Sequence, residues 1–88
     1  MDIMKNWNKY VDMYTTNAIF ARNARERLEK YKALPASNSF SELCNEVLIK
    51  SAQSSIENAE TMKEIIRKWC AESQAALKTL DEIDKEYS

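Results

Sequence analysis

The chain has 88 residues, of which 31% are charged and 44% hydrophobic, and its formal net charge is -1. It is too apolar for a disordered chain and long enough for only one small domain, residues 1–88. The near-neutral charge argues against a nucleic-acid-binding protein, since basic domains of that class carry clustered positive charge. Without histidine or glycine, the commonest general base and metal ligand and the glycine-rich phosphate loop are all missing. We therefore expect no enzyme activity, no cofactor and no metal.

The first element predicted is a helix over about residues 3–34. Its apolar positions alternate at spacings of four and three, which is typical of a helix that packs along a narrow seam against a partner helix. The seam consists of Ile3, Trp7, Tyr10, Tyr14, Asn17, Ala21, Ala24, Leu28 and Tyr31. Flanking residues, Phe20 among them, widen the apolar face beyond what one partner helix covers. We interpret Asn17 as a polar residue that sets the register.

A turn over residues 35–39 interrupts this pattern. Pro35 is the only proline, and it disfavours helical backbone at the preceding residue. Ser39 and Glu42 have the spacing of a capping box, in which each side chain accepts from the other residue's backbone amide. One helix should therefore end before this turn and a second should begin after it.

The second predicted helix covers about residues 40–86. The alternation resumes from Leu48 to Tyr87, with small residues in the middle, as in the first helix. In an antiparallel pair the small residues of both helices meet, while Trp7 and Tyr10 face the region of Met62, Ile66 and Trp69. The sequence thus predicts an all-α antiparallel helical hairpin with two long amphipathic helices, the second longer, assembling into a dimer, helical bundle or coiled coil.

The second helix would extend beyond the first by roughly 20 Å at 1.5 Å per residue. Because neither glycine nor proline marks a bend, a continuous helix is favoured over one that folds back near residue 72. Its apolar stripe would then lie bare, and such a stripe usually marks an interaction site. The predicted partner-binding surface consists of Trp7, Tyr10, Tyr14, Phe20, Trp69, Leu77, Leu80, Ile83 and Tyr87.

The two cysteines, Cys44 and Cys70, would be about 39 Å apart on one continuous helix. That is too far for a disulfide, so we expect free thiols, both in small core positions, and a reducing compartment such as the cytoplasm. No signal peptide is apparent, and no apolar run approaches the roughly 20 residues of a membrane-spanning helix.

Several stretches together resemble the phasin family, the small helical proteins that coat polyhydroxyalkanoate granules in bacteria. They are the amphipathic residues 17–28, the break at 33–38, the Phe-Ser-Glu-Leu segment at 40–43, and the Ser-Gln-Ala-Ala stretch at 73–76. The resemblance implies a non-catalytic protein, associated with granules in the cytoplasm, that turns an apolar face to the polyester surface.

Two other functions fit the same pattern. One is a helical protein–protein interaction module, such as a small chaperone, an adaptor or a secretion-system subunit, that covers a partner helix. The other is a nucleic-acid-binding hairpin using the basic residues between Arg22 and Lys32, which the interleaved Glu26 and Glu29 disfavour. The expected partners are therefore further copies of the chain, a hydrophobic granule surface or a partner helix.

Overall fold

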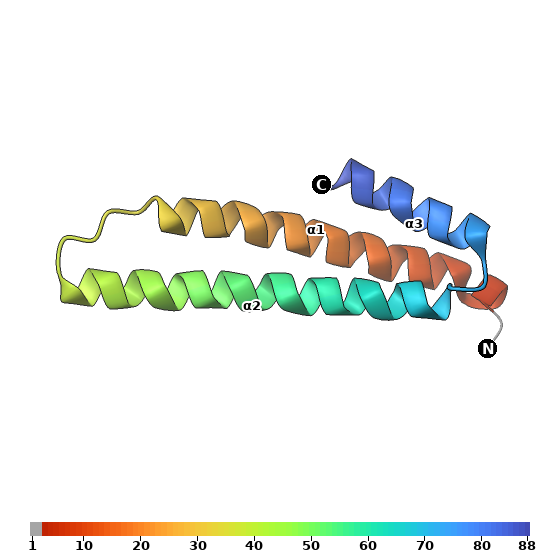
Figure 1. The fold of residues 1–88 in the computed structure, drawn as a ribbon, viewed down its shortest axis with the longest axis horizontal. Helices are drawn as coiled ribbons and strands as arrows, with labels where there is room; N and C mark the ends of the chain where they lie inside the picture. Colours follow the sequence, from red (N-terminus) through yellow and green to blue (C-terminus); the bar gives the residue numbers. More distant parts are fainter. Residues whose placement is uncertain (1–2) are drawn as a thin grey trace.

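The computed structural model describes residues 3–88, and all of its regular elements are helical. A short 3₁₀ turn, η1 (Ile3–Asn6), leads into α1 (Trp7–Lys32), which is followed by α2 (Ser39–Trp69) and α3 (Gln74–Glu86). The helices α1 and α2 run antiparallel and give the molecule its long axis, with extents of 55 × 22 × 16 Å (Figure 1). The all-α prediction is confirmed, but a third α-helix follows the antiparallel pair where the sequence predicted two helices.

The first break lies at residues 33–38, close to its predicted place. The side chain of Asn38 caps α2, its Oδ1 accepting from the Ser41 amide at 2.8 Å. The prediction that Ser39 caps this helix is therefore wrong by one residue. An extended backbone at Asn38 lets its amide side chain do the same work that the hydroxyl was expected to do.

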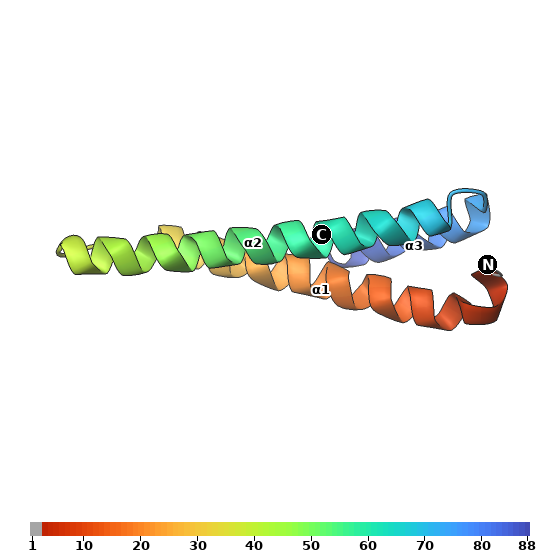
Figure 2. The ribbon, with the colours of Figure 1, turned by 90° about the horizontal axis from the view of Figure 1, so that it is seen from below.

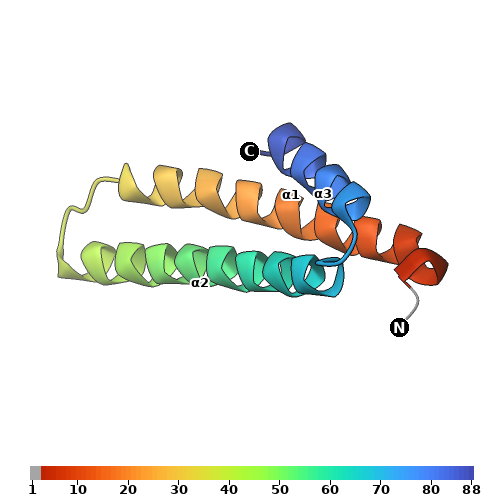
Figure 3. The ribbon, with the colours of Figure 1, turned by 45° about the vertical axis from the view of Figure 1, so that its right-hand side comes forward.

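The prediction of one continuous second helix to residue 86 is wrong. The helix α2 ends at Trp69, and α3 folds back along the open end of the hairpin (Figure 1 and Figure 3). Neither glycine nor proline is needed, because Ser73 takes up an extended backbone and its hydroxyl accepts from the Ala76 amide at 3.2 Å. Burial of the apolar stripe of α3 drives this return.

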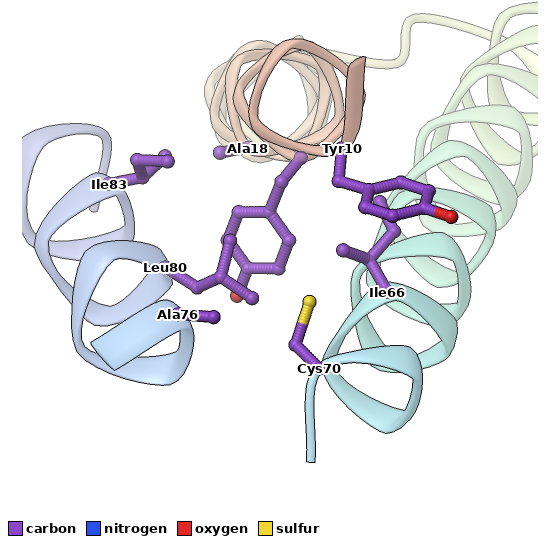
Figure 4. Packing of buried hydrophobic residues seen from close by; sticks show 8 residues of the cluster. Tyr10, Ala18, Ile66, Cys70, Ala76, Leu80 and Ile83 are labelled. Atoms are coloured by element: carbon purple, nitrogen blue, oxygen red, sulfur yellow. The ribbon is translucent and has the colours of Figure 1, made fainter. Parts of the chain in front are cut away.

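The main core lies where the three helices meet. Looking along the helices, Leu80 and Ile83 of α3 point toward Ala18 of α1, while Ile66 and Cys70 approach from α2 (Figure 4). Tyr14, Ile66, Leu80 and Cys70 are the largest fully buried side chains. The account in which Leu77, Leu80 and Ile83 stay bare is thus corrected: the chain buries or packs them itself.

Small residues let α1 and α2 approach closely in the middle of the hairpin, as the sequence predicts. Ala18, Ala21 and Ala24 are buried on α1, and Ala52 and Ala59 on α2. At the open end the Tyr10 and Trp69 rings pack with centroids 5.6 Å apart, which confirms the expected meeting of large residues there.

The register of the hairpin places the start of α2 beyond the end of α1, beside the loop at 33–38. Counting 22 residues forward from Tyr10 and 22 back from Trp69 pairs Lys32, the last residue of α1, with Val47. The residues of α2 before Val47 therefore extend past the end of α1, as the ribbon shows in two views (Figure 1 and Figure 2). The loop at 33–38 spans the difference.

Candidate interaction surface

The most exposed apolar side chains gather on the protruding first turns of α2. Phe40 is 74% exposed, Leu43 58% and Val47 59%, and Cys44 beside them is also exposed. Their spacings of three, four and seven place them on one face of the helix. We call Phe40, Leu43, Cys44 and Val47 the apolar patch. The end of α1 and the loop at 33–38 lie beside Glu42, Asn45 and Glu46 on another side of these turns, so the patch itself faces solvent.

The apolar patch continues into an uncharged strip along α2. The positions that follow at helical spacing are Ser51, Ser54, Asn58, Thr61 and Ile65. Ser51, Ser54, Asn58 and Thr61 are exposed and Ile65 is half-buried. The charged residues of α2 lie more than about 75° from Phe40 at 100° per residue, and Lys50 and Glu57 border the strip on one flank.

A shallow groove of about 490 Å³ runs between α1 and α2 at mid-length. Phe20, which is 57% exposed, lines it from α1, and Met62 lines it from α2. Asn17 also faces this groove, and its Nδ2 donates to the Met13 carbonyl at 2.8 Å. The Asn17 amide is thus hydrogen-bonded within its own helix. The other residues that line the groove are uncharged except for Arg27.

A cluster of polar side chains holds α3 onto the hairpin. The Tyr14 hydroxyl donates to Asp84 Oδ2 at 2.7 Å and accepts from Arg67 Nε at 2.8 Å. Lys63 Nζ lies 2.8 Å from Asp84 Oδ1, and Arg67 also pairs with Asp81 at 2.7 Å. We call Tyr14, Lys63, Arg67, Asp81 and Asp84 the polar cluster. It joins all three helices.

Three groups in this cluster, Tyr14, Arg67 and Asp84, have pKa values shifted from their ordinary values. Burial and then the hydrogen bond to Asp84 raise the pKa of Tyr14, so its hydroxyl stays protonated. Burial alone would raise the pKa of Asp84, but the hydrogen bonds from Lys63, Tyr14 and Arg67 outweigh it and hold that pKa below its ordinary value. Burial would lower the pKa of Arg67, but hydrogen bonds to both aspartates raise it. These paired charges hold α3 against α2, which is a structural role.

The predicted partner-binding residues divide into core and surface. Four are buried in the core: Tyr10, Tyr14, Leu80 and Ile83. Three are partly buried and packed against it: Trp7, Leu77 and Tyr87. Phe20 and Trp69 are exposed, in the groove and beside the ring of Tyr10 respectively. The predicted surface is therefore mostly the seam between α3 and the hairpin.

The predicted partner-binding surface omits the apolar patch of Phe40, Leu43, Cys44 and Val47. Their spacing marked an amphipathic face, but only the register shows that α1 ends before reaching it. For the same reason the prediction of a core position is wrong for Cys44, which is exposed. It is confirmed for Cys70, which is buried, and both thiols are free.

Neither a metal-binding cluster nor a membrane-spanning helix is found within residues 3–88. They contain no group of three or more acidic, cysteine or histidine side chains placed to hold a metal ion. Across the same residues, each helix lacks an 18-residue stretch apolar enough to cross a bilayer.

Comparison with known proteins gives no relative. No protein-family description matches this chain, and neither a curated protein nor a solved structure is significantly similar to it.

Proposed function

We propose that this chain is a non-catalytic, phasin-like protein that adsorbs to hydrophobic surfaces such as polyhydroxyalkanoate granules, within the cytoplasm. The observation that carries the proposal is the apolar patch. A small chain that can bury Leu80 and Ile83 by folding nonetheless leaves Phe40, Leu43 and Val47 in water. Such clustered exposure costs solubility and marks a surface that binds something apolar.

The position of the patch suits adsorption. It lies on the first turns of α2, which extend past the end of α1 and have only the loop at 33–38 beside them at that end (Figure 1). The uncharged strip continues along the same face of α2, with Lys50 and Glu57 on its flank and the other charged residues outside it. A helix of this kind lies in an interface with its apolar side chains inserted and its charged face in water.

The test is binding of purified protein to polyhydroxyalkanoate particles or an oil emulsion, followed by sedimentation or flotation. Val47→Ser and Phe40→Ser should each reduce the bound fraction several-fold. Phe20→Ser is the matched control, because Phe20 and Val47 are almost equally exposed but Phe20 lies in the groove on α1. Equal loss with all three variants, or no binding by the unaltered chain, would reject adsorption through the patch.

A second candidate function is favoured by the groove between α1 and α2. A trough lined by Phe20 and Met62 along two helices fits the apolar face of a partner helix, as in helical interaction modules. This function predicts one stoichiometric protein partner, lost with Phe20→Glu and kept with Phe40→Glu. The two functions therefore make opposite predictions for the same pair of positions.

A further inference from the structure

The uncharged face of α2 has a symmetry of its own. Its positions alternate at spacings of four and three, the pattern of a helix-pairing seam. They are Phe40, Cys44, Val47, Ser51, Ser54, Asn58, Thr61 and Ile65, and we call them the α2 seam. Phe40, Cys44 and Val47 lie at one end and Ile65 at the other, small polar residues lie between, and none of the members is charged. Such a face fits its own image when that image runs in the opposite direction.

We propose that the α2 seam pairs with the α2 seam of a second copy of this chain, forming an antiparallel homodimer. In this register Phe40 lies against the partner's Ile65, and Val47 lies against the partner's Asn58. Near the twofold axis Ser51 meets the partner's Ser54, and their small size lets the two helices approach closely. Phe40, now in water, is buried at each end of the interface.

The charges beside the seam select a second copy and its direction. Lys50 and Glu57 are exposed on one flank of the seam, seven residues apart. Within residues 3–88 neither makes an ion pair. Antiparallel pairing places Lys50 beside the partner's Glu57, and symmetry repeats this contact on the other side of the axis. Parallel pairing would instead place Lys50 beside the partner's Ser55, with no charge to meet it.

The rest of the fold leaves room for the partner. The buried residues Ala52, Ala59 and Ile66 each directly follow a seam residue, so they lie about 100° round the helix from it. Both α1 and α3 pack on that buried side, and the seam lies beside it, with Asn58 at the rim of the groove between α1 and α2. A second copy can thus approach α2 along its length without displacing either helix.

The dimer deepens the proposed function, because it names what covers the apolar patch when no hydrophobic surface is present. Self-pairing and adsorption would compete for Phe40 and Val47, so the dimer would regulate adsorption. Only this regulatory role of the dimer rests on the proposed function. The association itself is measured in plain buffer, and adsorption is measured separately with Lys50→Glu, which lies outside the patch. Failure of one proposal therefore leaves the other measurable.

The decisive experiment is a charge swap followed by sedimentation equilibrium at low ionic strength. Lys50→Glu and Glu57→Lys should each raise the dimer Kd about three- to tenfold, since each creates like-charge contacts twice per dimer. The double variant should return the Kd to within about twofold of the unaltered chain, because the ion pair is re-formed with its signs exchanged. Both positions are exposed, so each variant should fold, and circular dichroism checks this.

A monomeric unaltered chain would overturn the proposal. So would a dimer whose Kd ignores the single charge changes, or a double variant as weak as the singles.

Cysteine cross-linking tests the direction of pairing independently. In the proposed register the two Cys44 residues are about 25 Å apart, 17 residues along the helix axis, and cannot bridge. Thr61→Cys should bring a new thiol opposite the partner's Cys44 and give a covalent dimer on oxidation. The unaltered chain, and Thr61→Cys combined with Cys44→Ser, should stay uncross-linked. Efficient bridging of the unaltered chain through Cys44 would show a parallel pair and overturn the register.

Discussion

The hydroxyl of Tyr14 donates a 2.7 Å hydrogen bond to Asp84, a residue 70 positions later in the chain. This contact joins the N-terminal third of α1 to the last turn of α3, and Arg67 of α2 donates to the same hydroxyl. A single phenol therefore ties three helices together at the place where the apolar core is thickest. Burial of Leu80 and its apolar neighbours stabilises this junction, and the polar cluster pairs α3 with α1 and α2.

Asp84→Asn should loosen α3. The amide cannot pair with Lys63 and Arg67 as the carboxylate does, so both cations lose a partly buried counter-ion. We expect a loss of about 1–3 kcal/mol in the free energy of unfolding. In a Cys44→Ser background, the buried thiol of Cys70 should also react faster with an aqueous reagent. Asp81→Asn is the control, because Asp81 is largely exposed and should cost under about 1 kcal/mol.

Acid should release the same contact. Because the folded pKa of Asp84 lies below its ordinary value, its contribution is fully present above about pH 4, the unfolded pKa. That contribution is lost as the pH falls from there through the folded pKa. Urea unfolding from pH 5 downward should therefore show a stability decline that is steeper in the unaltered chain than in Asp84→Asn. Parallel declines would mean that Asp84 is not responsible.

Leu80→Ala should be among the most damaging single changes. The side chain is fully buried between the hairpin and α3, so truncation leaves a cavity and costs about 2–5 kcal/mol. Leu43→Ala offers a matched comparison, because the same chemical change is made where the side chain is 58% exposed. It should change stability by less than about 1 kcal/mol. Thermal unfolding of the two variants checks both, and similar midpoints would contradict the burial of α3.

The cap of α2 gives a direct comparison of neighbouring residues. Asn38→Ala removes the oxygen that accepts from Ser41 and should cost about 1 kcal/mol. Ser39→Ala should cost almost nothing, since Ser39 lies inside the helix and its hydroxyl has no cap role. Unfolding in urea measures both changes. A larger loss for Ser39→Ala would restore the capping box that the sequence pattern suggested.

The residue pattern by itself determined the helical content and the hairpin. It also determined that small residues meet in the middle of the hairpin and large residues meet at its open end. These features follow from local rules: alternation at spacings of four and three, the helix-breaking effect of Pro35, and side-chain volumes that match only in one antiparallel arrangement. Such rules act within a few turns of helix, so they can be applied without coordinates. The alanines and the Tyr10–Trp69 contact lie where those rules place them.

Tertiary structure alone decided which apolar stripe would be covered. The stripe with Leu80 and the stripe with Phe40 are both apolar in the sequence, yet the first is buried and the second is exposed. The difference comes from two global quantities: a return at Ser73 that lets α3 reach the core, and a register that ends α1 opposite Val47. Both depend on how whole helices pack together in space. The spacing of apolar residues shows that a helix has an apolar face, but burial of that face depends on which other helices lie against it.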